Sequence, residues 1–221
     1  MSIKENLINT LDNIPKQVKL VAVSKTKPNQ MIVEAYEAHQ RDFGENKVQD
    51  LVDKFEVLPK DINWHFIGHL QTNKVKYIAS FVHLIHAVDS LKLLKEINKQ
   101  ALKNDRTIDV LLQFHIAKEA SKFGLNTKTC QLLLDADSFN NLKNIRIVGV
   151  MGMATFTDDK NQVENEFKSL KSHFEVLKNN QFKTCNYFKE ISMGMSGDYK
   201  IAIEQGSTMV RVGSSIFGTR G

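Results

Sequence analysis

Short apolar runs alternate with longer segments of helical periodicity along this chain, and that alternation limits the fold more than any other feature. Each run is typical of a strand buried on both faces. Strands separated by helices pair in parallel through right-handed crossovers, so about eight such units predict a closed (β/α)8 barrel, the TIM barrel. The runs are residues 20–23, 42–43, 64–67, 84–88, 110–114, 145–150, 188–192 and 209–212.

Segments between the runs place apolar residues three or four positions apart, as amphipathic helices do. They are residues 2–13, 29–39, 47–55, 72–79, 90–103, 127–137, 161–179 and 198–205. An open doubly wound sheet is the competing architecture, but no Gly-x-Gly-x-x-Gly fingerprint follows the first run, which favours the barrel. No linker or internal repeat interrupts the 221 residues. We therefore expect one α/β domain over residues 1–221.

The charge pattern argues against a nucleic-acid binder. The chain has a formal net charge of +5 and a pI near 9.1, but its basic residues are mixed with acidic ones, as in residues 92–96. A nucleic-acid binder concentrates them in a stripe with interleaved aromatic residues. A basic balance equally suits an anionic small ligand. No apolar run is long enough to span a membrane and no secretory signal begins the chain, so we expect a cytoplasmic protein.

The cysteines and histidines predict neither a disulfide nor a metal site. Cys130 and Cys185 lie far apart and form no Cys-x-x-Cys pattern. Histidines 39, 83, 86, 115 and 173 show no common spacing of metal ligands. We therefore expect no metal ion.

Residues 20–28 contain the strongest chemical candidate. Lys25 comes just after the first apolar run, at the strand end where such folds place functional groups, and Pro28 suits the first turn of the following helix. Partial desolvation lowers the pKa of a lysine and provides the free amine that forms a Schiff base with a carbonyl group. A solvated loop lysine is the ordinary alternative.

Two turns near the C-terminus predict an anion site. After the seventh run, Ser-Met-Gly-Met-Ser-Gly-Asp (192–198) places Ser196 where the N-cap of a helix is expected, and after the eighth run Gly-Ser-Ser (213–215) begins a short helical turn. Hydroxyl and backbone N–H groups in such turns bind phosphate, and barrels often bind phosphate after strands seven and eight. Each turn alone is also typical of ordinary turns and caps.

Two further strand ends carry polar groups. Gly-Glu-Asn (44–46) follows the second run, and Gly-His-Leu-Gln-Thr-Asn-Lys (68–74) follows the third. Asn46 suits helix capping and ligand contact equally, whereas capping is the favoured role for Thr72.

Five motifs together resemble the pyridoxal-phosphate homeostasis proteins, the YggS/PROSC family. They occur in the family's order and cover the chain from about residue 21 to residue 218, while the stretch between about 90 and 144 matches mainly in pattern. The motifs are Val-Ser-Lys-Thr-Lys-Pro (23–28), Phe-Gly-Glu-Asn (43–46), Trp-His-Phe-Ile-Gly-His-Leu-Gln-Thr-Asn-Lys (64–74), Ser-Met-Gly-Met-Ser-Gly-Asp (192–198) and Gly-Ser-Thr-Met-Val-Arg-Val-Gly-Ser-Ser-Ile-Phe-Gly (206–218).

This resemblance implies a fold-type III barrel, like the N-terminal domain of alanine racemase, that binds pyridoxal 5′-phosphate (PLP). By position, Lys25 would be the aldimine lysine and Asn46 would lie beside the cofactor ring. Arg211 would face the pyridine nitrogen and disfavour its protonation, which makes the ring a poorer electron sink. Serine stands at 214 where the family often has threonine, and the hydroxyl is kept. The residues that would hold the phosphate are Ser196, Gly213 and Ser214.

The fold and the resemblance leave three functions open. The family implies a non-catalytic carrier, a monomer or weak dimer that supplies PLP transiently to apo-enzymes and balances PLP and amino-acid pools. A PLP-dependent racemase needs a second acid–base group, which related racemases take from an additional β-domain; the chain ends at Gly221, so we expect no such domain. A class I aldolase-type barrel would use Lys25 without a cofactor. The missing second base favours the carrier.

Overall fold

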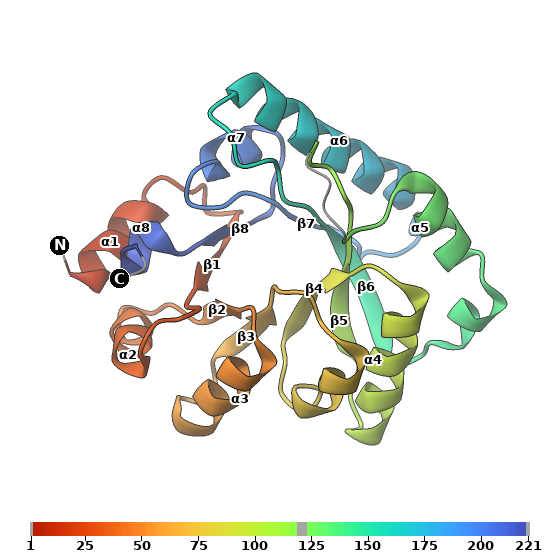
Figure 1. Cartoon of the computed structure of the whole chain (residues 1–221), viewed down its shortest axis with the longest axis horizontal. Coiled ribbons are helices and arrows are strands. Elements are labelled where there is room, and N and C mark those ends of the chain that lie inside the picture. Colours follow the sequence, from red (N-terminus) through yellow and green to blue (C-terminus); the bar gives the residue numbers. More distant parts are fainter. Residues whose placement is uncertain (1, 119–122, 220–221) are drawn as a thin grey trace.

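Eight parallel strands close into a barrel in which each strand pairs with its neighbours in sequence and β8 pairs with β1 (Figure 1). The structure is a computed structural model that describes residues 2–118 and 123–219. The strands are β1 (Lys19–Val23), β2 (Asp42–Glu45), β3 (Asn63–Phe66), β4 (Leu84–Val88), β5 (Ile108–Gln113), β6 (Ile145–Met151), β7 (Glu190–Ser192) and β8 (Met209–Val212). The predicted (β/α)8 barrel is confirmed, and the doubly wound sheet is wrong.

Helices surround the barrel, and α1 (Ile3–Leu11) lies beside α8 (Ser214–Phe217), so the first and the last helix are neighbours (Figure 1). The side-chain amide of Asn6 donates to the carbonyl oxygen of Ile216 at 3.1 Å. No helix in the described part of the chain combines the length and the apolar character needed to cross a membrane. The other helices are α2 (Asn29–Glu37), α3 (Val48–Val57), α4 (Leu91–Lys103), α5 (Thr127–Leu134), α6 (Lys160–Asn179) and α7 (Tyr199–Glu204), with 3₁₀ helices η1 (Thr72–Tyr77) and η2 (Asp137–Asn141).

Polar caps begin several of these helices where the sequence predicts a start. Ser2 Oγ accepts from the Glu5 backbone N–H at 3.2 Å, and the Ser2 N–H donates to Glu5 Oε2 at 2.8 Å, which completes a capping box. Ser90 Oγ accepts from the Leu93 N–H at 3.3 Å at the start of α4. Each cap satisfies backbone donors that have no partner within the helix.

The strands divide their side chains between two buried clusters, because successive side chains in a strand point to opposite faces of the sheet. In β1, Leu20 and Ala22 belong to the large cluster shared with the helices, whereas Val21 belongs to a small cluster inside the barrel. Burial on both faces explains why the strands appear in the sequence as nearly continuous apolar runs. The small cluster consists of Val21, Leu84, Ala87, Leu111, Val148, Met151 and Met209.

Several predicted elements differ from the structure in kind or extent. The helix predicted over residues 72–79 is the 3₁₀ helix η1. The seventh strand begins at Glu190 and not at residue 188, because Phe188 stacks in the outer cluster with Phe174 and Phe182 at ring-centroid distances of 5.0 and 4.3 Å. The helix predicted over residues 127–137 divides into α5 and η2. In the seventh strand, aromatic packing overrides the strand preference of Phe188.

Candidate functional site

Lys25 lies in the turn that leaves the C-terminal end of β1, and its side chain is partly buried. The next residue, Thr26, has a φ of 64°, a left-handed conformation that β-branched residues rarely adopt. Lys27 Nζ donates to the carbonyl oxygens of Gly218 at 2.9 Å and Thr219 at 3.0 Å, and so ties the turn to the C-terminal segment. Such strained residues persist where the surroundings fix them, and they concentrate at functional sites.

A buried carboxylate fixes the backbone directly before Lys25. Glu45 Oε1 accepts hydrogen bonds from Ser24 Oγ and from Lys54 Nζ, both at 2.6 Å. Lys54 Nζ also donates to the backbone carbonyl of Ser24 at 2.9 Å. Burial raises the pKa of the Glu45 carboxyl, against the opposing effect of Lys54. Glu45 Oε2 is buried with no hydrogen-bond partner among the described residues.

The two glycine-containing turns at the ends of β7 and β8 contact each other and the end of β1. The Gly213 N–H donates to Ser196 Oγ at 3.1 Å. An added Cβ at Gly213 would lie 3.0 Å from the carbonyl oxygen of Val23, two residues before Lys25. The prediction that Ser196 caps a helix is wrong, because α7 begins after Asp198 and Ser196 instead joins the two turns.

Arg211 lies inside the barrel on β8 and is almost completely buried. Its Nη1 donates to Ser192 Oγ at 2.6 Å, and its Nη2 donates to the carbonyl oxygen of Gly152 at 3.0 Å. Burial lowers the pKa of this guanidinium to about 10, while the negative charge of Asp198 acts in the opposite direction. Arg211 is therefore a positive charge at neutral pH.

Asn46 follows β2 and lies against the loop that follows β3. An added Cβ at Gly68 would lie only 2.3 Å from the Asn46 carbonyl oxygen, so the two loops are in close contact. Asn46 is not a helix cap, because Lys47 holds the N-cap position of α3. The capping prediction for Thr72 is also wrong, since η1 begins at Thr72 itself and its N-cap is Gln71, without a side-chain hydrogen bond.

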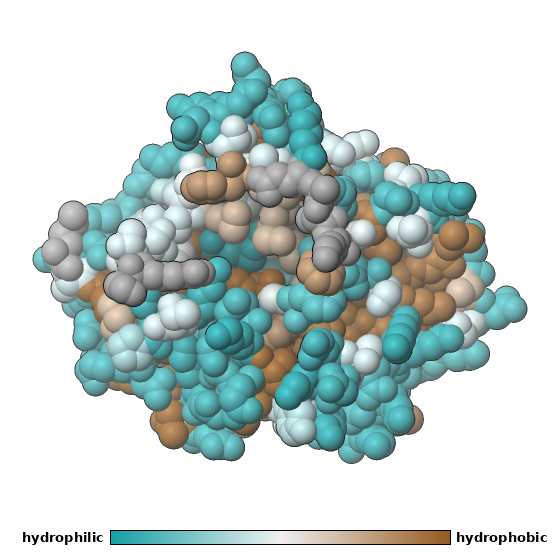
Figure 2. All heavy atoms as spheres, in the orientation of Figure 1, coloured by the Kyte–Doolittle hydropathy of each residue, from teal (hydrophilic) through white to brown (hydrophobic). Residues whose placement is uncertain are grey.

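A cavity of about 320 Å³ lies at the same end of the barrel, between the loops that follow β3 and β4. It is lined by residues 69–73, 89, 90 and 93, and none of the six predicted cofactor residues is among them. Figure 2 shows mostly hydrophilic residues over the face in view, with a hollow near its middle. The cavity is therefore separate from the turns around Lys25.

Comparisons with known proteins place this barrel in a family. The family model of the alanine racemase N-terminal domain matches residues 1–221. The pyridoxal phosphate homeostasis protein of Haemophilus influenzae is 40% identical over 206 residues, which cover 92% of this chain and 85% of that protein. The protein of the same name from Aquifex aeolicus is 37% identical over 203 residues, 91% of this chain and 87% of that one. The chain belongs to the pyridoxal phosphate homeostasis proteins of the alanine racemase N-terminal family.

Solved structures agree with this family. PipY of Synechococcus elongatus superposes with a TM-score of 0.90 in its structure without PLP and 0.87 with PLP bound, at 33% and 32% identity. Both superpositions cover 98% of this chain and 100% of PipY. Alanine racemase of Clostridium difficile superposes with a TM-score of 0.75 at 14% identity, over 99% of this chain and 56% of the racemase, and shares the fold alone.

In this member of the homeostasis family, the predicted site residues all lie at or near the C-terminal ends of β1, β2, β7 and β8. Ser196 and Gly213 are in direct contact, and Gly213 approaches the end of β1 before Lys25. Ser214 begins α8 directly after Gly213, and Arg211 lies two residues earlier, inside the barrel. Asn46 follows β2, which pairs with β1.

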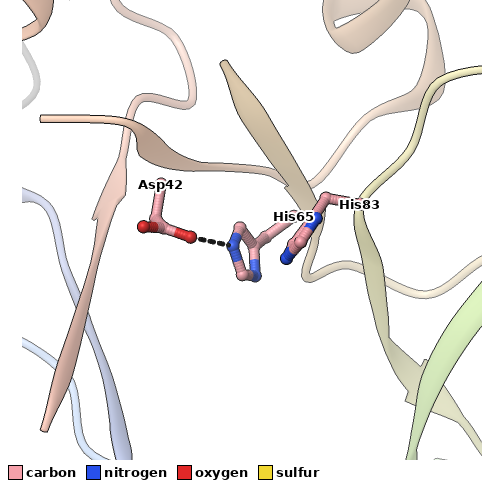
Figure 3. A group of neighbouring side chains, drawn as sticks. All are labelled: Asp42, His65 and His83. Carbon is pink, nitrogen blue, oxygen red and sulfur yellow. Dashed lines mark hydrogen bonds and ion pairs between the residues drawn. The ribbon is translucent and has the colours of Figure 1, made fainter. Parts of the chain in front are cut away.

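Sequence reasoning missed two sets of polar residues. Lys54 lies three positions after buried Leu51, on the inner face of α3. Its place among the regularly spaced apolar positions of the helix was the signal in the sequence that this lysine is buried. The second set includes Asp42, His65 and His83, whose candidate ligand atoms lie within 4.8 Å of one another (Figure 3). Sequence spacing indicated no metal cluster, because these three residues belong to β2, to β3 and to the position before β4, and only the pairing of these neighbouring strands brings them together.

Proposed function

We propose that this chain binds PLP at the C-terminal end of its barrel, with the Lys25 amine as the covalent anchor, and acts in PLP homeostasis. The main support is the contact between two turns, since Gly213 lies against the end of β1 just before Lys25. A lysine amine beside hydroxyl and backbone N–H donors suits a ligand that carries both an aldehyde and a phosphate. PipY, which is similar over the whole chain, was solved with PLP bound.

The other predicted residues suit different parts of the same ligand. The hydroxyls of Ser196 and Ser214 suit the phosphate, together with backbone N–H groups of that turn. Arg211 uses Nη1 and Nη2 on protein oxygens, and a guanidinium has five N–H donors, so donors remain for the pyridine nitrogen. The Asn46 side chain would lie beside the ring. The donor set therefore fits PLP.

The charge of Arg211 bears on how strongly bound PLP would withdraw electrons. Bound PLP supplies an electron sink for amino-acid chemistry, and that sink is strongest when the pyridine nitrogen is protonated. A guanidinium facing the nitrogen disfavours its protonation by like-charge repulsion. We infer that the protein holds PLP and supplies it transiently to apo-enzymes.

An absorption spectrum of the freshly purified protein is the first test. We expect a visible band from bound PLP that borohydride reduction removes. Racemase and transaminase assays on the same sample should show no turnover above that of free PLP. A protein that stays colourless after PLP is added would contradict the cofactor assignment, and sustained racemisation would favour the enzyme instead.

Replacement of both Ser196 and Ser214 by alanine should weaken PLP retention. Each hydroxyl contributes one hydrogen bond to a charged phosphate, and together they are expected to change the Kd roughly 100-fold. The measurement is a fluorescence titration with PLP. Ser172→Ala, on the exposed side of α6, is the matched control and should bind like the unaltered protein. Unchanged affinity in the double variant would place the phosphate elsewhere.

Gly68→Ala should disturb both stability and the placement of Asn46. The new Cβ would meet the Asn46 carbonyl oxygen at 2.3 Å, and because this atom is backbone, the loop after β2 must shift. We expect a loss of about 1–3 kcal/mol in unfolding free energy together with weaker PLP binding. Gly197→Ala has no heavy atom within 4 Å of its Cβ and is the control for stability in urea unfolding. Equal stability of both variants would contradict the close contact of these loops.

A further inference from the structure

A line of hydrogen-bonded side chains crosses the barrel interior from the proposed cofactor end to the opposite end. Arg211 Nη1 donates to Ser192 Oγ at 2.6 Å, and Ser192 Oγ lies 3.0 Å from His86 Nδ1. His86 Nε2 lies 2.9 Å from His65 Nδ1, and His65 Nε2 lies 2.9 Å from Asp42 Oδ1. We call these five residues the buried relay.

The two ends of the buried relay fix which residue donates in each of its hydrogen bonds, and both ends require the same order of donors and acceptors. A guanidinium only donates, so Ser192 Oγ accepts from Arg211 and its own hydrogen is available for His86 Nδ1. At the other end a carboxylate only accepts, so His65 Nε2 carries the hydrogen given to Asp42. A neutral His65 then accepts at Nδ1 from His86 Nε2–H. Every bond in the relay therefore runs from Arg211 towards Asp42.

Burial supports the neutral state that this arrangement requires. His65 and His86 are both fully buried. Burial lowers the pKa of His65 to about 4 and lowers the pKa of His86 well below its ordinary value, where Arg211 and Lys19 also disfavour protonation. Burial alone would raise the pKa of Asp42, but the hydrogen bond from His65 holds it below its ordinary value. The relay therefore joins one cation to one anion through two neutral rings.

We propose that Asp42, at the N-terminal end of the barrel, orients Arg211 and offsets its buried charge through Ser192, His86 and His65. These four residues are then positioning residues for the group that faces the PLP ring. The proposal rests on the proposed function, since Arg211 faces PLP only if that function holds. If the proposal holds, a substitution at Asp42, at the N-terminal end of the barrel, changes the titration of bound PLP although Asp42 does not contact it.

A metal ion is the competing explanation for the far end of the relay. Asp42, His65 and His83 offer three ligand atoms within 4.8 Å of one another, and His83 lines a cavity of about 280 Å³ (Figure 3). However, Lys19 Nζ lies 3.7 Å from Asp42 Oδ1, and this nearby cation opposes a metal ion. The bond to Asp42 also occupies His65 Nε2 already.

Nitrogen-15 NMR of the histidine rings in PLP-free protein tests the relay independently of the cofactor. We expect His65 and His86 to be neutral, both with the proton on Nε2, and to keep these signals between pH 6 and 8. The opposite tautomer on either ring would overturn the proposal. Zn²⁺ added at one equivalent should leave both rings unchanged. If it shifts His65 and His83 together, the group is a metal site and the relay assignment is wrong.

Asp42→Asn tests the connection to the cofactor, because it removes the charge and keeps the shape. The pH titration of the absorption band of bound PLP should shift by on the order of half a pH unit, with little change in phosphate affinity, probed with inorganic phosphate. Asp109→Asn is the matched control, since Asp109 also lies near the start of its strand, at the same end of the barrel, but pairs with Arg146 at 2.7 Å. His86→Leu interrupts the relay at its middle and should reproduce the shift.

The outcomes separate this inference from the proposed function. Equal PLP titrations for the unaltered protein, Asp42→Asn and His86→Leu would overturn the inference while leaving PLP binding intact. A shift of the same size in Asp109→Asn would also overturn it, because any charge at that end would then suffice. Absence of PLP binding in the unaltered protein would instead contradict the proposed function, and the NMR result would still decide whether the relay exists.

Discussion

Lys25→Ala should abolish the covalent attachment of PLP. Only an amine can form the carbon–nitrogen double bond with the PLP aldehyde, and Lys25 lies at the strand end beside the two turns proposed to hold the phosphate. After borohydride reduction, the unaltered protein should carry the added pyridoxyl mass on the peptide that contains residue 25. The variant should carry none and should lose the visible band.

Lys27→Ala is the matched control for this experiment. Lys27 offers a second amine two residues away, but its Nζ is bonded to the carbonyl oxygens of Gly218 and Thr219. We therefore expect the Lys27 variant to keep the covalent adduct on Lys25. A borohydride-stable adduct that persists in Lys25→Ala, on Lys27 or elsewhere, would remove Lys25 from the role of anchor.

The strand order and the closed barrel were predictable because they depend on a repeated local pattern. Each apolar run is buried on both faces, so its sequence is continuous, and β1 shows this with Leu20 and Ala22 outside and Val21 inside. Boundaries were less predictable where packing competes with propensity. Phe188 has the sequence character of a strand but stacks with two aromatic rings outside the sheet.

The candidate site was predictable only where its residues occupy short motifs. Lys25, Asn46 and Ser196 lie in the short loops that follow apolar runs, so the rule that barrels place functional groups after their strands locates them. The buried relay was not predictable, because its residues are distant in sequence. His86 and Ser192 are 106 positions apart, and no local periodicity relates them. Only the closure of the barrel gives them a common interior.

The two carboxylates of β2 lie at opposite ends of that strand and have different partners. Glu45 lies at the C-terminal end of β2 and is bonded to Lys54, and Asp42 lies at the N-terminal end of that strand and accepts from His65. A buried charge is costly unless it is paired and hydrogen-bonded. A single four-residue strand thus places one anion beside the turn that contains Lys25 and another at the start of the buried relay.

Acidification should destabilise the protein well before its carboxylates titrate. The unfolded chain protonates its histidines near pH 6.5, whereas burial keeps His65 neutral until about pH 4. Between these values the unfolded state binds more protons than the folded state, so stability falls as the pH falls. His65 alone should cost about 3 kcal/mol of unfolding free energy across this window, and His86 adds to the loss. Glu45, whose pKa is raised, offsets part of it near the acid end.

Urea unfolding at pH 7, 6, 5 and 4 measures this dependence. The comparison is between His65→Asn and His39→Asn, because His39 is exposed and has a φ of 69°, which asparagine tolerates. His65→Asn should be less stable at pH 7 and should lose less stability on acidification, since its contribution of about 1.4 kcal/mol per pH unit is removed. His39→Asn should keep the full slope. A slope unaffected by His65→Asn would mean that this ring is protonated in the folded state, which the direction of the buried relay does not allow.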